Sequence, residues 1–343
     1  MNALFARALA ASLRVAQRRS PRAVCDDPSI LVIRRNRMGD MICTLPLLRA
    51  LRRQYPAARL TVACDAAGVP IAQACSAVDK VIPLERGWYL WTMPLQRPQQ
   101  WQDFDWVIAA KAGFDRRLAS LARLSNAARR IGYGNADAAD FYTDPVPVPA
   151  DLWNVHQVEA TLRLLEPLGI APPADPVVDL KLDLPASAIA FADALAPSWQ
   201  GRSLVLINIS STSTLCFRDE DFAALATELS SRANLAVAFV GLPADLPRAE
   251  RMVGNSAGRV RVIATPGALE LAALIARARV LITGEGGAAH LAAATGTPAV
   301  VIWSDAPFEK WHSRGTNHVF VRAEPGEEAI PAARVREALV AHL

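Results

Sequence analysis

A single carboxylate stands among basic residues in the segment Arg34–Arg49, and this combination could do chemistry. The carboxylate is Asp40, and the basic residues before it are Arg34, Arg35 and Arg37. They lie between an apolar run at 29–33 and a helix-like segment at 45–55. A strand, a glycine-containing turn and a helix start form a common ligand-binding corner of α/β folds, where a carboxylate can act as a general base. Two interpretations without a ligand stay open, a helix-capping acid and a structural ion pair.

A second stretch, TGEGGAAH at 283–290, is typical of an anion site. Glycines let a backbone approach a ligand closely, and the helix expected directly after them favours a diphosphate through its N–H groups and dipole. His290 could donate to a phosphate oxygen, and Glu285 could accept from sugar or ribose hydroxyls. The stretch lacks the GxxxxGK[ST] pattern of a phosphate loop, and it is not the dinucleotide fingerprint either, because no GxGxxG follows the first strand. A purely structural turn is the alternative.

A third stretch, NISSTST at 208–214, is rich in hydroxyl groups. Ser210, Ser211 and Thr212 could hold phosphate oxygens, or they could cap the helix that follows. All three stretches come directly after a predicted strand. Because parallel α/β sheets bind ligands at the carboxyl ends of their strands, each stretch is a candidate for the binding site.

The elements that must position these residues alternate between strand and helix. Strands are expected at 30–33, 59–63, 80–84, 106–110 and 130–132 in the first half, and at 203–208, 235–240, 260–263, 280–283 and 299–303 in the second. Helix-like segments are expected at 45–55, 69–75, 116–124, 154–168, 219–232, 244–253, 269–277, 288–295 and 332–342. This alternation predicts parallel sheets with helices on both faces. The predicted fold class is α/β, with two Rossmann-like, doubly wound domains facing a central cleft.

The proline-rich stretch GIAPPADP at 169–176 marks a linker. We therefore expect an N-terminal domain at 23–175 and a C-terminal domain at 176–330. A basic arm at 1–22 precedes them, and a helix at 331–343 closes the chain.

Composition excludes several classes of protein. The chain has 343 residues, 52% of them hydrophobic and 20% charged, and no apolar run approaches the roughly 20 residues of a membrane-spanning helix. Its five cysteines show no CxxC pair and no zinc spacing, so we expect no metal and a reducing cytoplasm. The net charge is +4, and the arm alone carries +5, so the remainder carries −1. Because the body is nearly neutral, we expect no nucleic-acid partner.

The arm has two interpretations. Arg7, Arg14 and Arg18 fall on one side of a helical wheel, opposite an apolar side that includes Phe5 and Leu9. This pattern is typical of an interfacial helix whose basic face meets anionic lipid headgroups. The alternative is a docked terminal helix without a membrane role. The expected location is thus cytoplasmic, with a peripheral contact to the inner membrane under the first interpretation.

Two long motifs give the sequence a family resemblance. Residues 30–62 read ILVIRRNRMGDMICTLPLLRALRRQYPAARLTV and resemble the opening of the ADP-heptose:lipopolysaccharide heptosyltransferases, glycosyltransferase family 9. Residues 284–303 read GEGGAAHLAAATGTPAVVIW and are similar to the family's G-x-D-[ST]-G-x-x-H-L-A-A-A-x-G-T-P run. His156 and Glu159 stand in a helix like the family's "H.vE..L.LL..LG". The resemblance covers nearly the whole chain beyond the arm, in the right order.

The resemblance implies a metal-free GT-B fold whose last helix packs back towards the N-terminal half. It implies an inverting transfer of a heptose, or a related sugar, from a nucleotide donor, with ADP-heptose as a substrate and no cofactor. Asp40 corresponds to the family's proposed base. On this view the segment around Asp40 is the acceptor side, with acceptor-binding residues Arg34, Arg37, Gly39 and Thr44. The donor-binding residues would be Ser210, Ser211, Thr212, Arg218, Glu285, Gly286, Gly287 and His290.

The donor side departs from the family pattern in three places. Leu215 stands where the family usually has a lysine that meets the donor phosphate, and Arg218 or an arginine of the first loop could compensate. Glu285 replaces an aspartate, and Gly286 replaces a serine or threonine. Three hypotheses follow. The first is a family 9 transferase that acts on a lipid-linked lipopolysaccharide-core or related surface glycan. The second is a GT-B transferase using a UDP- or GDP-sugar, and the third is an inactive GT-B scaffold that binds glycans or partner proteins.

Overall fold

The structure is a computed structural model. It describes residues 27–84, 98–101, 103–135, 138–210, 217–254, 258–304, 306–324 and 326–343. The chain divides into two compact units, Met1–Asp179 (unit 1) and Leu180–Leu343 (unit 2). The predicted boundary at 175/176 lies close to this division. The predicted arm at 1–22 lies outside the described residues.

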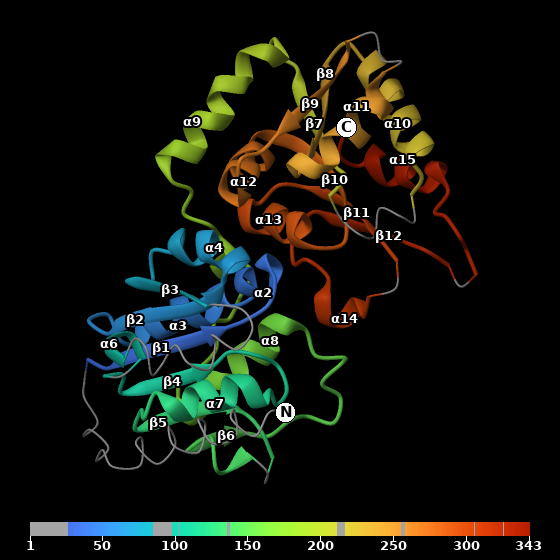
Figure 1. Ribbon diagram of the computed structural model, residues 1–343. Helices are drawn as coiled ribbons and strands as arrows, with labels where there is room; N and C mark the ends of the chain where they lie inside the picture. The colour runs from blue at the N-terminus through green and yellow to red at the C-terminus, as the bar shows by residue number, and fades with distance from the viewer. Residues whose placement is uncertain are drawn as a thin grey trace. The chain divides into compact units, whose positions relative to one another are not determined.

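Unit 1 is built on a six-stranded sheet in which all neighbouring strands run parallel (Figure 1). The strand order is β3-β2-β1-β4-β5-β6. Because the order runs outward from β1 in both directions, right-handed crossovers place the helices of the two halves on opposite faces. The strands are β1 (Ser29–Arg34), β2 (Arg59–Asp65), β3 (Lys80–Leu84), β4 (Trp106–Ala109), β5 (Arg129–Tyr133) and β6 (Asp144–Val146).

The helices of unit 1 lie between and after these strands in the sequence. They are α2 (Met38–Ile42), α3 (Leu45–Gln54), α4 (Val69–Gln73), α6 (Pro98–Trp101), α7 (Arg116–Leu124) and α8 (Gln157–Leu162). Helix α7 begins after Asp115, whose carboxylate accepts from the backbone N–H of Arg117 and Leu118 at 2.8 and 3.2 Å. The helix predicted at 154–168 is α-helical only over α8 and continues as a 3₁₀ helix from Arg163 to Leu168. Pro167 lies in that segment and cannot donate a backbone hydrogen bond.

The core of unit 1 fixes β1 rigidly. Residues 30–33 of this central strand are completely buried. Leu31 and Ile33 pack in one cluster with Leu118 and Leu121 of α7. Each such aliphatic side chain contributes about 1.5–3 kcal/mol on burial. The end of β1, where the Asp40 segment begins, is therefore firmly anchored.

Unit 2 repeats the same topology. Its sheet is also six-stranded and parallel, in the order β12-β11-β10-β7-β8-β9. Counted from its own first strand, β7, this is the same Rossmann order as in unit 1. The strands are β7 (Ser203–Asn208), β8 (Leu235–Gly241), β9 (Val260–Ala264), β10 (Ala278–Gly284), β11 (Ala299–Trp303) and β12 (His318–Arg322).

The helices of unit 2 surround this sheet in the same manner (Figure 1). They are α9 (Ala186–Leu195), α10 (Asp219–Ser231), α11 (Leu246–Val253), α12 (Ala268–Arg277), α13 (Gly287–Thr295), α14 (Phe308–Trp311) and α15 (Ala332–Val340). One core cluster joins the strands to α10, with Phe217 and Phe222 in edge-to-face contact at 4.6 Å between ring centroids. Val335 and Leu339 of α15 belong to that cluster. Within unit 2, α15 packs on β11, β12 and α10. The packing of this helix towards the N-terminal half stays a prediction.

Every predicted strand is present, and the predicted α/β class with doubly wound sheets is confirmed. Two strands, β6 and β12, were not predicted. Both lie at a sheet edge and are only partly buried, so neither shows a continuous apolar run. Helix α9 was also missed because its alanine-rich sequence has little apolar periodicity.

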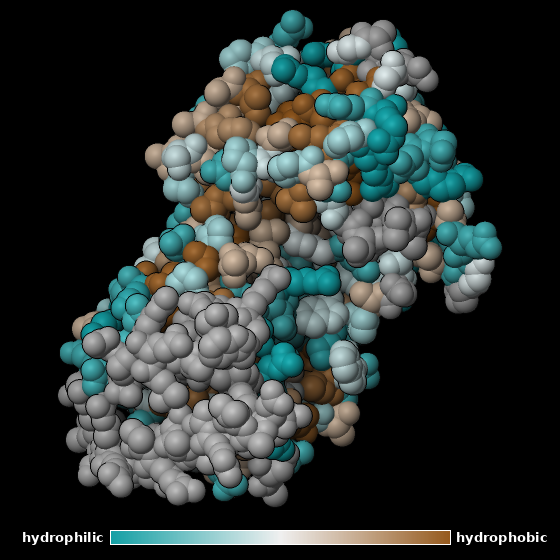
Figure 2. Space-filling view, in the orientation of Figure 1, coloured by the Kyte–Doolittle hydropathy of each residue, from teal (hydrophilic) through white to brown (hydrophobic). Residues whose placement is uncertain are grey.

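Exposed large hydrophobic side chains come from scattered places. They are Trp153, Val178, Ile189, Leu242 and Val340. Single exposed hydrophobic residues are normal on protein surfaces. On the face that Figure 2 shows, hydrophilic side chains are distributed over both units. No helix among the described residues is both long enough and apolar enough to cross a membrane.

A partly buried histidine gives unit 2 a pH-dependent stability. Burial lowers the pKa of His318 from 6.5 to about 4. Its ring nitrogens lie 2.7 Å from Ser313 Oγ and 3.3 Å from the Thr297 carbonyl oxygen. Because the folded-state pKa lies below the unfolded one, the neutral ring stabilises the fold fully above the unfolded pKa, and this contribution is lost as pH falls towards the folded pKa. We expect His318 to account for about 2 kcal/mol of the stability lost between about pH 7 and about pH 5.

The measurement is urea unfolding of the wild-type protein and His318→Asn at both pH values. The variant has no group that titrates in this range at position 318, so its free energy of unfolding should fall less steeply on acidification. Equal slopes in the two proteins would contradict the assignment.

Candidate active site

The predicted loops lie where the strand order of each sheet reverses. In unit 1 the strand order reverses between the neighbouring strands β1 and β4, and the Asp40 segment follows β1. In unit 2 the strand order reverses between β7 and β10. The hydroxyl-rich stretch follows β7, and the glycine-rich stretch follows β10. Ligands of open α/β sheets bind outside the carboxyl ends of strands at such switch points. The topology therefore gives these loops the position expected of a binding site.

Asp40 lies in the short helix α2, and both its carboxylate oxygens have partners. Oδ1 accepts a hydrogen bond from Arg34 Nη2, and Oδ2 accepts from the Arg37 backbone N–H at 3.1 Å. The residue is 8% exposed. Both interpretations without a ligand are thus present in the structure, because Asp40 caps α2 and pairs with an arginine. A carboxylate oxygen has two acceptor sites, so these bonds leave capacity for a further proton.

The predicted acceptor-binding residues behave differently from one another. Arg34 is 2% exposed, and its guanidinium also donates to the Ala110 carbonyl oxygen. Its contact with an acceptor stays a prediction. Thr44 is fully buried, and its hydroxyl donates to the Asp40 carbonyl oxygen at 2.9 Å. Gly39 is buried within α2. The side chain of Arg37 is exposed and remains the candidate for an acceptor contact.

A second carboxylate, Asp65 at the end of β2, holds the turn before α2. Asp65 Oδ2 accepts from the Asn36 backbone N–H at 2.8 Å, and Oδ1 lies 3.5 Å from Arg35 Nε. Asn36 has φ +92°, a conformation uncommon outside glycine. The turn sends the N–H groups of two consecutive residues to two carboxylates, Asn36 to Asp65 and Arg37 to Asp40.

Sequence reasoning missed Asp65, although a signal existed. An acid that directly follows a predicted strand lies at the same sheet edge as the Asp40 segment. Its neighbour Cys64 is no nucleophile, because burial, with a smaller effect from the Asp65 charge, raises the pKa of the Cys64 thiol to about 12.

In unit 2, the strands β7 and β10 are joined at their ends by polar side chains. Asn208 Nδ2 donates to Thr283 Oγ1 at 3.0 Å, and both residues are buried. The hydroxyl of Ser210 donates to Asp245 Oδ2 at 2.7 Å and accepts from the Leu242 N–H at 2.8 Å. To donate to a phosphate instead, the Ser210 hydroxyl would have to give up its hydrogen bond to Asp245. Ser211, Thr212 and Leu215 lie outside the described residues.

The glycine-rich turn leads into the nine-residue helix α13. Glu285 bends to the neighbouring strand, where its Oε1 accepts from Ser304 Oγ at 3.1 Å and its N–H donates to the Ile302 carbonyl oxygen at 3.0 Å. Gly286 has φ +133° and ψ −157°, which side-chain-bearing residues rarely adopt. Gly287 begins α13, and His290 lies one turn later with 7% exposure. The N-terminus of α13 thus lies at the carboxyl edge of the sheet beside Glu285.

Arg218 lies immediately before α10. Its side chain is 67% exposed and forms an ion pair with Asp221 one turn along, at 3.0 Å. Hydrogen bonding to Asp221 raises the pKa of Arg218. The guanidinium is therefore bound to its own helix, and a role in place of the absent lysine would require it to exchange this partner.

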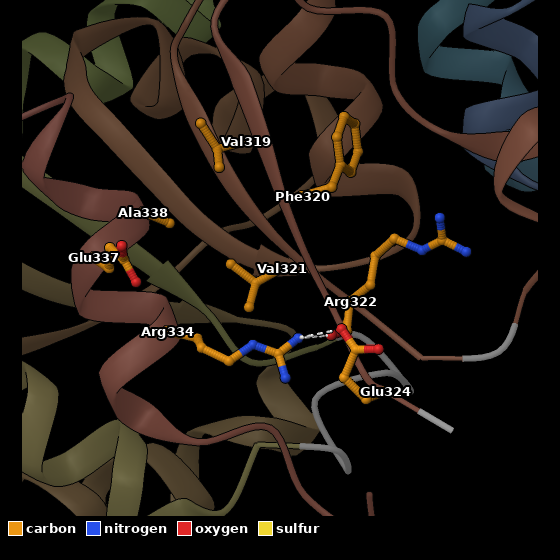
Figure 3. A pocket seen from close by; sticks show the side chains of 8 residues that line it. All are labelled: Val319, Phe320, Val321, Arg322, Glu324, Arg334, Glu337 and Ala338. Atoms are coloured by element: carbon orange, nitrogen blue, oxygen red, sulfur yellow. Dashed lines mark hydrogen bonds and ion pairs between the residues drawn. The ribbon is translucent and has the colours of Figure 1, made fainter. Parts of the chain in front are cut away.

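A cavity of about 440 Å³ lies elsewhere in unit 2, between β12 and α15. Figure 3 shows Arg334 extending from α15 towards Glu324, to which it is 3.7 Å distant. The cavity is lined by residues 319–322, Glu324, Arg334, Glu337 and Ala338. None of them was predicted as a site residue, and β12 is an edge strand, separated from β7 by β11 and β10. The cavity is therefore separate from the switch point.

Comparison with protein families identifies one match across most of the chain. A model described as glycosyltransferase family 9 (heptosyltransferase) matches residues 95–336. A search of curated protein sequences gave no significant match.

Solved structures show the same fold. A family 9 glycosyl transferase from Veillonella parvula has a TM-score of 0.79 and 19% identity, with 93% of this chain and 98% of that chain covered. E. coli ADP-heptose lps heptosyltransferase II has a TM-score of 0.72 and 18% identity, with 91% and 98% covered. E. coli heptosyltransferase WaaC with ADP-2-deoxy-2-fluoro heptose has a TM-score of 0.72 and 21% identity, with 92% and 100% covered. The predicted GT-B class of two Rossmann-like units is thereby confirmed.

Proposed function

Because the chain belongs to glycosyltransferase family 9 and is a glycosyltransferase, we propose that it transfers a heptose, or a closely related sugar, from a nucleotide-diphosphate donor. The proposed donor is ADP-heptose, since a solved heptosyltransferase of the same fold carries an ADP-heptose analogue. The proposed acceptor is a lipopolysaccharide-core or related surface glycan, because another such structure is named for lipopolysaccharide heptose transfer.

One observation supports the proposal above the others: a carboxylate is held at the switch point of unit 1. Asp40 is fixed at both oxygens, by Arg34 and by the Arg37 N–H. The same residue is the one that the family resemblance marks as the base.

The proposed reaction is an inverting displacement. The acceptor hydroxyl oxygen attacks the anomeric carbon of the donor sugar and forms the new glycosidic bond. Asp40 takes the hydroxyl proton as that bond forms. The bond between the anomeric carbon and the diphosphate oxygen breaks on the opposite side, and the nucleoside diphosphate leaves with the electron pair.

The glycine-rich turn of unit 2 would stabilise the leaving group. Exposed N–H groups at the start of α13 and the positive end of its dipole favour an anion there. His290 in the first turn can donate to a phosphate oxygen, and Glu285 can accept from a hydroxyl of the sugar or ribose. Stabilisation of the developing negative charge lowers the barrier most when the donors are fixed in advance.

The proposed acceptor is attached to a lipid, so a membrane contact by the basic arm at 1–22 would bring the enzyme to its acceptor. Its arginines would contact the anionic surface of the inner membrane from the cytoplasmic side. The exposed Arg37, beside Asp40, would meet phosphate groups of the acceptor.

The donor is tested by thermal unfolding of the purified protein with a panel of sugar nucleotides. ADP-heptose at 100 times its Kd should stabilise the fold by about 2.7 kcal/mol. ADP alone should give part of this effect, and UDP- or GDP-sugars should give little. Transfer is then measured as ADP release with a heptose-deficient lipopolysaccharide acceptor.

Two outcomes would contradict the proposal. Stabilisation by UDP-sugars or GDP-sugars alone would assign the chain to a different donor. Binding of glycan without transfer from any donor would favour the scaffold hypothesis over heptose transfer.

A further inference from the structure

A buried arginine ends the central strand of unit 1. Arg34 is 2% exposed, whereas Arg35 is partly exposed and Arg37 is exposed. A buried cation is stable only when charged or polar partners satisfy it. The guanidinium of Arg34 donates to Asp40 Oδ1 and to the Ala110 carbonyl oxygen. Arg34 is therefore committed to internal partners.

These two partners lie on the two sides of the switch point. Ala110 directly follows β4, and its N–H donates to the Ile33 carbonyl oxygen of β1 at 2.9 Å. Asp40 lies in the helix that follows β1. Arg34 thus connects the rigid end of β4 to the carboxylate. Because a guanidinium is planar with donors in fixed directions, it fixes direction as well as distance.

The second carboxylate oxygen of Asp40, Oδ2, is held by a backbone group of the chain itself. The Arg37 N–H that reaches Oδ2 is aimed by the turn at Asn36, whose own N–H is bound to Asp65. The Asp40 carbonyl oxygen accepts from Thr44. Rotation of the carboxylate would break a bond at Oδ1 or Oδ2.

We propose that Arg34 is a positioning residue for glycosyl transfer: it holds the Asp40 carboxylate in a single orientation towards the acceptor hydroxyl. The inference rests on the proposed function, in which Asp40 is the base. It assigns Arg34 a role different from the phosphate contact predicted from the sequence. A misplacement of about 1 Å at a reacting group lowers a rate by roughly 100-fold.

The test compares Arg34→Ala and Arg34→Lys with the wild-type enzyme in steady-state kinetics for donor and acceptor. We expect Arg34→Ala to lower kcat by roughly 100-fold while the acceptor KM changes by less than about 3-fold. Arg34→Lys keeps the charge but not the fork, and should lose roughly 10-fold in kcat. Guanidinium at about 10 mM, well below denaturing concentrations, should restore part of the kcat of Arg34→Ala by filling the vacated site.

Arg52 provides a matched structural control in the same unit. Its guanidinium binds Asp79 Oδ2 at 2.6 Å and the carbonyl oxygens of Pro56, Ala58 and Ala77. Arg52→Ala should lower the Tm but leave kcat unchanged, and guanidinium should not affect it. This separates loss of a structural arginine from loss of positioning.

Several results would overturn the positioning role alone. They are an unchanged kcat in Arg34→Ala, a raised acceptor KM with full kcat at saturation, or a Lys variant as slow as the Ala variant with no response to guanidinium. Each of them requires an active wild-type enzyme. A wild-type chain that transfers no sugar from any donor would instead overturn the proposed function, and the positioning role with it.

Discussion

Replacement of Asp40 by alanine should lower kcat by roughly 1,000-fold or more while donor binding persists. General-base catalysis is worth about 10²–10⁴-fold, and Asp40 belongs to unit 1, whereas the loops proposed to bind the donor belong to unit 2. The measurement combines kcat from ADP release with the donor Kd from thermal shift or calorimetry. Retained turnover within about tenfold of wild type would exclude Asp40 as the base.

The same substitution should also destabilise the fold, which complicates the interpretation of lost activity. Asp40 is the carboxylate partner of the buried Arg34, and removing one member of a buried pair costs about 3–5 kcal/mol. A drop in activity could then reflect unfolding as well as lost chemistry. Circular dichroism and urea unfolding of Asp40→Ala measure this effect directly.

The double variant Asp40→Ala with Arg34→Met separates the two effects. Methionine removes the unpaired cation and fills much of the space with an apolar side chain, so stability should recover towards that of the wild type. Activity should not recover, because the base is still missing. Recovery of both stability and turnover would mean that Asp40 serves the fold alone.

The architecture was predictable because buried parallel strands have a strong local signal. Residues 30–33, 204–207 and 299–302 are continuous apolar runs, and the structure buries all of them. The edge strands β6 and β12 lack this signal because solvent reaches part of each. The conformation of α2, a five-residue helix, depends on contacts with groups distant in sequence, which no local pattern records.

The location of the candidate site was predictable, but the role of each residue in it was not. The sequence gives no reason to assign different roles to the three arginines near Asp40. Contacts across the sheet distinguish them. Arg34 is buried because Ala110, 76 residues later, offers its carbonyl oxygen. Asp65, which anchors the turn at Asn36, is 29 residues away. Such partners emerge only when the strand order is known.

Gly286→Ser, which restores the residue type usual in the family, should weaken donor binding here. Gly286 has φ +133°, where a side chain adds strain of about 1–3 kcal/mol. To relieve it, the backbone must shift at the entrance to α13, where the donor diphosphate is proposed to lie. We expect the donor KM to rise roughly 10- to 100-fold, measured at saturating acceptor.

Gly296 offers a control at the other end of the same helix. It has φ +74°, and a Cβ atom there would meet nothing within 4 Å. Gly296→Ser therefore adds backbone strain at the carboxyl end of α13, the end opposite the glycine-rich turn. Both variants should lose stability, but only Gly286→Ser should raise the donor KM.

The comparison decides why this chain departs from the family pattern. If Gly286→Ser binds the donor more tightly, the turn can take up the family conformation and the serine hydroxyl is a missing phosphate ligand. If Gly286→Ser binds the donor more weakly and Gly296→Ser binds it normally, Gly286 belongs to a donor loop that differs from the family pattern and still binds the donor. The hydrogen bond between Glu285 and Ser304 favours weaker donor binding by Gly286→Ser. Glu285 is one methylene longer than the aspartate usual in the family, and together with Gly286 it forms a single altered turn.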